Sequence, residues 1–371
     1  MPKLQISLYQ LFILIVLFEL GTAVLFGPGS SAKQDAWIAN LLGLAVGVLL
    51  LLIYYRLFTY YPELLLTSYV QKILGKWLGG LIAFFYISYF LYQSSRILRD
   101  IGELLVTTIY TNTPLIVLNA FMIITIMYGI YKGFEVIARV GELCFIGVYL
   151  LAILGFFTIL FTDILHIENL KPILENGWSP VLKTVLRTTI NFPFGEMVVL
   201  TMLLPFLKHQ KKVLTVCLSG IILSGINITI TSVINVAVLG VEFFIRSPFP
   251  LYNTIRKIEL TTFIQRLDIF FILYLIVAGF FKLCLYYYVA VIGAADLFKI
   301  KDHSILIFPL GAVIIMGSIT IASNYSEHIE EGTVMIPYLF HMPFQLVIPV
   351  ILLIIAFIKG LKSGKCPRQN K

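Results

Sequence analysis

The chain has 371 residues, of which 59% are hydrophobic and only 12% are charged. An average soluble domain has about 25% charged residues, so a protein this poor in charge could not cover its surface with polar groups in water. The composition excludes an ordinary water-soluble globular protein, and it leads us to attribute the net charge of +8 to membrane topology rather than to nucleic-acid binding.

Ten stretches are apolar over roughly the 20 residues that a helix needs to cross a bilayer. A backbone in lipid must satisfy its own hydrogen bonds, so we expect these stretches to be helices rather than strands. In chain order they cover 7–28, 37–58, 78–106, 114–131, 138–161, 184–207, 213–239, 268–295, 304–323 and 337–358. The sequence therefore predicts an all-α integral membrane protein with ten transmembrane helices, and a single polytopic membrane domain over 1–371.

Basic residues gather in alternate loops, and this pattern indicates the orientation. With the N-terminus inside, the inner loops carry Arg56, Lys72, Lys76, Lys132, Arg139, Lys208, Lys211, Lys212, Lys299 and Lys301. The tail at 359–371 is also basic, whereas the connection between the ninth and tenth spans is acidic. Because cytoplasmic loops carry an excess of lysine and arginine, we expect a multi-pass protein of the cell membrane with both termini in the cytoplasm.

Two of the outer connections, 162–183 and 242–266, are long. The second contains a Ser-Pro-Phe-Pro segment at 247–250, followed by a helix-like stretch at 251–260. These connections either pack at the membrane interface or form a gate or a docking surface for a partner, and the sequence favours neither interpretation.

The first and sixth spans both contain residues that interrupt helices. Span one includes Gly21 and the Gly-Pro-Gly segment at 27–29, and span six includes the Phe-Pro-Phe-Gly-Glu segment at 192–196. Glycine and proline weaken or kink helices, and breaks at corresponding places in two five-helix halves are the sequence pattern of a transporter site near the bilayer midplane. The alternative is a pair of ordinary kinks, since both residues are common in membrane helices.

An interrupted helix frees amides, which favour a carboxylate, and carbonyls, which favour an ammonium group or a cation. A zwitterionic amino acid suits such breaks. No metal or cofactor is expected, because no histidine–cysteine cluster has metal-ligand spacing and no glycine-rich phosphate loop follows a strand-like run. The predicted ligand-binding residues are Gly21, Thr22, Ala23, Phe192, Phe194, Gly195 and Glu196 at the breaks, with Tyr89 and Tyr92 on the third span.

Two ionisable residues lie where the spans cross the middle of the bilayer. Glu19 precedes the first break, and Lys282 lies near the middle of the eighth span. A charge at the bilayer centre costs about 2.5–3.5 kcal/mol on insertion scales, so such residues usually face a cavity or one another. We predict a coupling role, with Lys282 near Glu19 or the first break in place of a metal cation. The alternative is a purely structural ion pair.

The roles of the other charged residues are less clearly indicated by the sequence. Glu196 ends the second break and is predicted to cap the start of the following half-helix. Four residues cluster at the outer part of the third span, namely Arg96, Arg99, Asp100 and Glu103. For this cluster we predict a solvated vestibule or a partner contact rather than a binding site.

Several stretches carry a resemblance to a known family. They are Ile6–Gln10 leading into Gly21-Thr22, then Asn169–Gly177, Phe192–Glu196, Arg266–Asp268 and Phe280–Leu283. With these stretches the chain resembles the endospore germination permeases, the B subunits of spore germinant receptors, within the amino acid–polyamine–organocation superfamily. The resemblance covers nearly the whole chain. It implies a leucine-transporter-like fold with inverted repeats over about 7–161 and 184–358, the spore inner membrane, and a complex with A and C subunits.

Three functions fit these features. The first is a nutrient germinant receptor subunit that binds an amino acid or similar nutrient at the broken helices and triggers spore germination with its partners. The alternative is a proton-coupled amino-acid permease, in which Lys282 replaces a coupling sodium and titrates during the cycle. The third is a scaffold that only anchors the other subunits, and the breaks and buried charges argue against it. None of the three is an enzyme, and the expected partners are the nutrient, the A and C subunits and the bilayer, with no nucleic acid.

Overall fold

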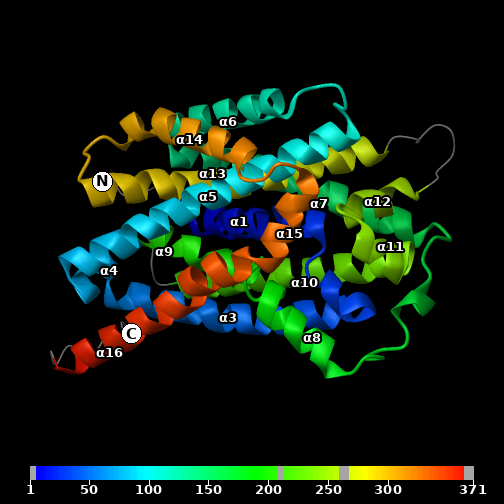
Figure 1. Ribbon diagram of the computed structural model, residues 1–371, viewed down its shortest axis with the longest axis horizontal. Helices are drawn as coiled ribbons and strands as arrows, with labels where there is room; N and C mark the ends of the chain where they lie inside the picture. The colour runs from blue at the N-terminus through cyan, green and yellow to red at the C-terminus, as the bar shows by residue number, and fades with distance from the viewer. Residues whose placement is uncertain (1–5, 208–211, 259–266, 363–371) are drawn as a thin grey trace.

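The computed structural model describes residues 6–207, 212–258 and 267–362, which form a bundle of long helices (Figure 1). No strand occurs within these ranges. Over the same residues, nine helices are long and apolar enough to cross a membrane. The third predicted span is α5, Lys76–Thr108, which has the length of a span at 33 residues but carries polar and charged side chains in its second half.

The long helices lie close to the predicted ranges. They are α3 Ala36–Tyr60, α5, α6 Leu115–Lys132, α7 Phe134–Leu160, α10 Val213–Leu239, α13 Leu267–Phe298 and α14 Ile307–Thr320. The last span is a π-helical segment, Pro337–Val347, continued by α16, Ile348–Lys362. Short helices in the connections are α4 Leu66–Leu74, α11 Val241–Arg246, α12 Pro250–Arg256 and α15 Tyr325–Val334. The last residues of the predicted basic tail, 363–371, lie outside the described residues.

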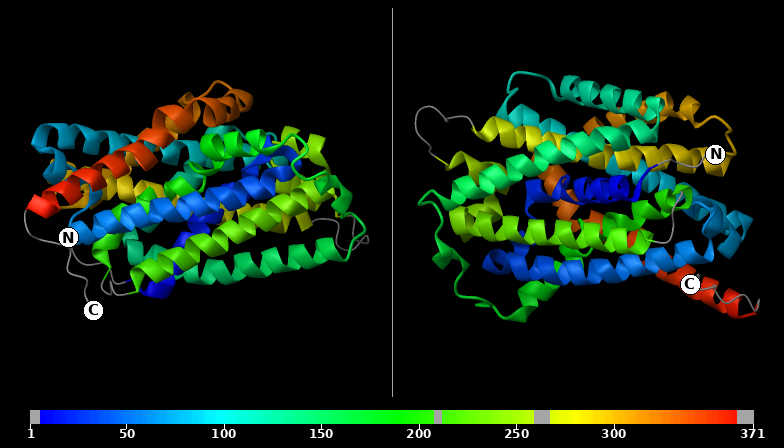
Figure 2. Two further views of the ribbon diagram at one scale, coloured as in Figure 1. Left: turned by 90° about the horizontal axis from the view of Figure 1, so that it is seen from below. Right: turned by 180° about the vertical axis from the view of Figure 1, so that it is seen from behind.

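Helix α1, Leu8–Leu20, is buried over most of its length. It packs against α7, α10 and α13, and it lies in the middle of the bundle in Figure 1 and in the right view of Figure 2. In the most apolar stretch of the first span 78% of the residues are buried, against 17% in that of α7, so most of α7 faces outward from the bundle. A capping box fixes the start of α1: the Ser7 hydroxyl accepts the Gln10 amide at 3.0 Å, and the Gln10 side chain accepts the Ser7 amide at 2.9 Å.

The first span is broken where the sequence predicts. Helix α1 ends at Leu20, and Gly21 and Thr22 separate it from α2, Ala23–Phe26. Gly27 then ends α2 with a φ of 59°, a conformation that glycine adopts without steric cost. A 3-10 turn, Ser30–Asp35, leads into α3.

The sixth span is divided into more segments than the first. It begins as α8, Trp178–Thr184, passes through a π turn, Val185–Thr189, and continues as irregular turns at 190–193, where the backbone hydrogen bonds reach back three, four or five residues. It resumes as a 3-10 segment, Phe194–Val199, followed by α9, Leu200–Leu203, and a second 3-10 turn at 204–206. Because these segments change their hydrogen-bond period several times, backbone groups in the middle of the span are free of the regular α-helical ladder.

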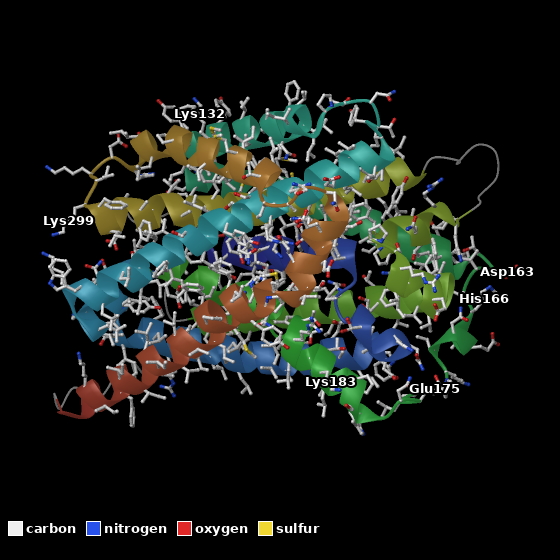
Figure 3. All side chains as sticks on the ribbon, viewed as in Figure 1. Lys132, Asp163, His166, Glu175, Lys183 and Lys299 are labelled. Carbon is white, nitrogen blue, oxygen red and sulfur yellow. The ribbon has the colours of Figure 1, made fainter. Side chains whose placement is uncertain are left out.

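The loops that were predicted to face opposite sides of the membrane lie at opposite ends of the bundle. Lys299 lies at one end, while Asp163, His166 and Glu175 lie at the other (Figure 3). At the Lys299 end, α4 is bound to α13, because the Ser68 hydroxyl donates to a carboxylate oxygen of Asp296 at 2.7 Å and Thr67 donates to the same carboxylate. The far end carries α11, α12 and the start of α8 (Figure 1).

Candidate functional site

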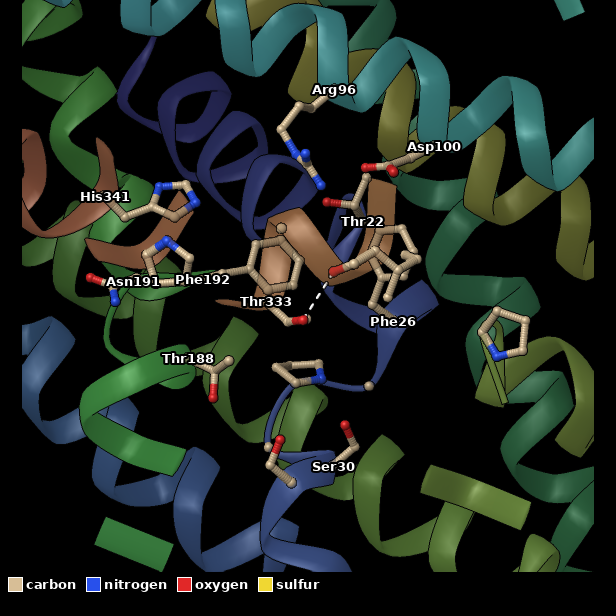
Figure 4. Close-up of a pocket in the computed structure, with 18 of the residues that line it drawn as sticks. Thr22, Phe26, Ser30, Arg96, Asp100, Thr188, Asn191, Phe192, Thr333 and His341 are labelled. Carbon is tan, nitrogen blue, oxygen red and sulfur yellow. Dashed lines mark hydrogen bonds between the residues drawn. The ribbon is translucent and has the colours of Figure 1, made fainter. Parts of the chain in front are cut away.

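The two breaks share one cavity of about 360 Å³. Figure 4 shows how side chains from four parts of the chain converge on it: the first break, α5, the sixth span, and the segment from α15 into the last span. The residues that line it include Thr22, Gln93, Arg96, Asp100, Phe192, Glu196, Gly332 and His341. Exposed Ser31, Ile245 and Thr333 also line the cavity, so it reaches the surface on the side of α11 and α15.

The residues predicted to bind ligand fall into two groups in the structure. Thr22, Phe192 and Glu196 line the cavity. The others are buried or half-buried without lining it, namely Gly21, Ala23, Phe194, Gly195, Tyr89 and Tyr92. The ring of Tyr92 is stacked on Phe340, with 5.1 Å between the ring centroids. The breaks therefore bring three predicted residues to the cavity wall, and their role in binding stays a prediction.

A buried ion pair links the broken helices. The ammonium of Lys282, on α13, lies 2.5 Å from a carboxylate oxygen of Glu196 in the sixth span. The stem of Lys282 passes so close to the first span that a Cβ added at Gly21 would lie 2.7 Å from its Cδ. Lys282 is therefore near the first break, as predicted, but its charged partner is Glu196 rather than Glu19. Glu196 makes no capping hydrogen bond at the start of its 3-10 segment.

Neighbouring aromatic residues stabilise the two charged groups of this ion pair. The Tyr286 hydroxyl donates to the second carboxylate oxygen of Glu196 at 3.0 Å. The Lys282 ammonium lies 4.6 Å from the centre of the Phe192 ring and 5.5 Å from that of Phe18. Cation–π contacts of this kind contribute about 2 kcal/mol when desolvated. They offset part of the cost of removing two ions from water, and they place Phe192 between the cavity and Lys282.

Glu19 is fully buried, and neither of its carboxylate oxygens has a hydrogen-bond partner among the described residues. It lies at the end of α1, within electrostatic reach of Lys282 and Glu196. A buried polar group without a partner is costly, so this carboxyl group has an unused capacity to hold a proton or a cation. No cluster of three or more His, Cys, Asp or Glu residues suited to a metal occurs in the described part of the chain.

The last span contributes a polar network that the sequence analysis missed. His341 and Gln345 project from the π-helical segment, Pro337–Val347, and His341 lines the cavity. The Tyr89 hydroxyl lies 3.0 Å from Nδ1 of His341, and it accepts hydrogen bonds from Gln345 at 2.8 Å and from Gln93 at 3.2 Å. The signal in the sequence is a histidine and a glutamine four residues apart within an otherwise apolar span.

The predicted solvated vestibule on the third span is wrong for Arg96 and Asp100, because both side chains are buried and line the cavity. The connection between the ninth and tenth spans folds as α15 and covers them. Nη2 of Arg96 donates to the carbonyl oxygen of His328 on α15 at 2.7 Å, and Nε2 of His328 lies 2.7 Å from Oδ1 of Asp100. The sequence showed the acidic face of this connection but not its buried histidine.

The two long connections behave differently. The first packs on the end of α10: the His166 amide and the Asn169 side chain both donate to the Ala237 carbonyl, at 3.1 and 3.0 Å. The second supplies Ile245, Ser247 and Pro248 to the cavity wall near its opening. The packing interpretation fits the first connection, and the second is part of the site.

Comparisons with known proteins agree with this architecture. The family model described as "Spore germination protein" matches residues 5–326. Spore germination protein KB of Bacillus subtilis is 44% identical over 365 residues, covering 98% of both chains. Spore germination protein YndE of the same organism is 28% identical over 324 residues, covering 85% of this chain and 87% of its own. The resemblance found in the sequence is therefore confirmed.

A solved structure, described as MhsT in complex with L-phenylalanine, superposes on this chain with a TM-score of 0.67. The match covers 96% of this chain and 99% of the other, at 12% sequence identity. At this identity the match shows the fold alone. The predicted leucine-transporter-like fold of a multi-pass membrane protein is thereby confirmed.

Proposed function

Because the chain belongs to the family of spore germination proteins, we propose that it is the B subunit of a nutrient germinant receptor and binds an amino acid or similar small nutrient between its broken helices. The family and the fold identify a membrane receptor or permease rather than an enzyme. The observation that carries the proposal is the shared cavity, which both breaks line and whose wall includes Glu196 of the Lys282–Glu196 pair.

A ligand in this position can act on the arrangement of the helices. It would contact Thr22 of the first break and Phe192 of the second, while Lys282 joins the two breaks from behind. A ligand shifts a conformational equilibrium only by its difference in affinity for the two states. A site divided between two segments would supply such a difference, because a ligand that contacts both segments loses contacts when one of them moves.

An amino acid fits the chemistry of the cavity. Its volume of about 360 Å³ lies at the lower end of the range of small-molecule sites. Charged Arg96 and Asp100 face the same space as the apolar rings of Phe26 and Phe192, which together suit a zwitterionic head and an apolar side chain. The related fold of MhsT is described with L-phenylalanine bound, and this supports an amino acid over a sugar.

The cellular setting follows from the family. We propose that the chain lies in the spore inner membrane with both termini in the cytoplasm, and that it triggers germination together with A and C subunits. If a partner subunit responds to the ligand, that subunit must change the ligand affinity of this chain by the same factor as the ligand changes the affinity between the subunits. Nutrient titrations of the lone chain and of the complex measure this coupling directly.

A proton-coupled amino-acid permease is the second candidate, and one observation favours it. Glu19 is buried beside the first break with both oxygens unpartnered among the described residues. A carboxyl group in this position could exchange a proton during a transport cycle, and a receptor that only changes shape does not need one.

Two measurements on the purified chain test the proposal. Calorimetric titration with the twenty L-amino acids should detect binding of at least one, and Thr22→Val should weaken it while Thr125→Val, at an exposed position on α6, should not. In vesicles, the lone chain should accumulate little of the amino acid that it binds. Absence of binding would exclude the nutrient site, and rapid gradient-driven accumulation would favour the permease.

A further inference from the structure

Two arginines one turn apart on α5 are buried in different ways. Arg99 donates from Nη1 to three backbone carbonyls, those of Ser318, Ile319 and Ala322, and its Nη2 lies 3.3 Å from a carboxylate oxygen of Glu103. These contacts anchor the end of α14 to α5. The charge of Arg99 is therefore neutralised by Glu103, and its side chain holds two helices together.

Arg96 has no carboxylate within ion-pair distance among the described residues. It is only 8% exposed, and its hydrogen bonds go to neutral groups, the His328 carbonyl at 2.7 Å and the Tyr92 hydroxyl at 3.4 Å. A guanidinium group has five N–H donors and stays charged at any physiological pH. Most of its donors therefore have no protein partner among the described residues, in a place where an uncompensated charge is expensive.

The guanidinium group of Arg96 points into the cavity (Figure 4). The other cation near the cavity, Lys282, is neutralised by Glu196, so Arg96 supplies the unpaired positive charge among the described lining residues. Asp100 lines the same space and is held by His328 rather than by Arg96. The wall thus presents a cation and an anion that do not neutralise each other.

From this arrangement we propose that Arg96 binds the carboxylate of the cavity ligand and thereby selects ligands that carry one. This inference rests on the proposed nutrient site and adds the residue that recognises the head group. A planar guanidinium group matches a carboxylate through two parallel hydrogen bonds. The freed amides of the first break are a weaker anchor, because α2 has only four residues and its partial charge is small beside a full one.

The test compares each amino acid with its own amide, which keeps size and shape but removes the negative charge. The probes are L-alanine, L-leucine and L-phenylalanine with their amides, titrated into the purified full chain. The acid should bind at least about tenfold more tightly than its amide, as expected for hydrogen bonds to a charged group. Arg96→Gln keeps an N–H donor for the His328 carbonyl and removes the charge, and it should reduce the acid-to-amide ratio to near one.

A second variant acts on the guanidinium group without replacing it. A Cβ at Gly332 on α15 would lie 2.2 Å from Nη2 of Arg96, so Gly332→Ala should displace that group and lower the ratio, even if Arg96→Gln does not fold. Gly147→Ala on α7 is the matched control, since nothing lies within 4 Å of its added Cβ. Arg99→Lys should lower the thermal stability but keep the ratio.

The outcomes separate the two proposals. If the wild-type chain binds an acid and its amide equally, or if folded Arg96→Gln and Gly332→Ala keep the wild-type ratio, Arg96 is not the carboxylate anchor and the nutrient site remains. If the wild-type chain binds none of these probes and none of the other amino acids, the nutrient site is wrong and this inference falls with it.

Discussion

Replacing Lys282 by methionine should destabilise the protein, because it leaves the buried carboxylate of Glu196 without its cation. Lys282 is fully buried, and the side chain of Glu196 is only 3% exposed. Without the ammonium group, the Glu196 carboxylate keeps a single hydrogen-bond donor among the described residues, the Tyr286 hydroxyl at 3.0 Å. Removing one partner of a buried ion pair costs about 3–5 kcal/mol, and the lost contact with the Phe192 ring adds up to about 2 kcal/mol.

The diagnostic experiment is a double-mutant cycle. Glu196→Gln removes the other charge and keeps an acceptor for Tyr286, so the double variant has no uncompensated ion. We expect each single variant to unfold several degrees below the wild type, and the double variant to recover much of that loss. Thermal unfolding of the four purified proteins in one detergent, together with their yield in membranes, provides the comparison.

Additive losses of stability in the double variant would contradict this prediction. Groups that do not interact give changes that sum to within about 0.5 kcal/mol. If the losses of Lys282→Met and Glu196→Gln simply add, the two side chains are not paired in the folded protein. Lys282 would then have another partner and would not join the two breaks.

Three further predictions concern the breaks, the topology and Glu19. Gly21→Ala should lower both stability and ligand affinity, because its Cβ would lie 2.7 Å from the stem of a buried lysine, while Gly80→Ala, with nothing within 4 Å, should match the wild type in unfolding and titration experiments. In a cysteine-free background, cysteines at Glu175 and Lys299 should react with a membrane-impermeant reagent from opposite sides, and labelling from one side would contradict the arrangement in Figure 3. Glu19→Gln should keep or raise the unfolding temperature, since its carboxylate oxygens have no partner among the described residues. A clear drop would reveal a bound cation that the amide cannot hold.

The elements of the fold could be predicted because their signals are local. Runs of apolar residues of spanning length predict the helices, and Gly21 and the segment at 192–196 predict the breaks, whose backbone follows from residue type. Lys282 could be recognised as a functional candidate for the same reason, since a lysine in an apolar span needs a partner.

The contact partners of the buried charged side chains could not be predicted, because these contacts depend on how each helix is rotated about its axis. Lys282 and Glu196 are 86 residues apart in the chain, and nothing in either segment distinguishes this pairing from one with Glu19. Arg96 was misjudged for a related reason. Its burial comes from α15, more than two hundred residues later in the sequence, and its charge alone was typical of a solvated helix end.

The attachment of α4 to α13 bears on whether this molecule can carry a solute across. Thr67 and Ser68 both donate to Asp296, and hydrogen bonds to a charged group are worth about 1.5–3 kcal/mol each. If a carrier opened the bundle at this end, each turnover would have to break these bonds and form them again. A receptor can leave these bonds in place throughout its working life. Asp296→Asn weakens these contacts, and it should appear first as an ion conductance through the chain, before any loss of ligand recognition.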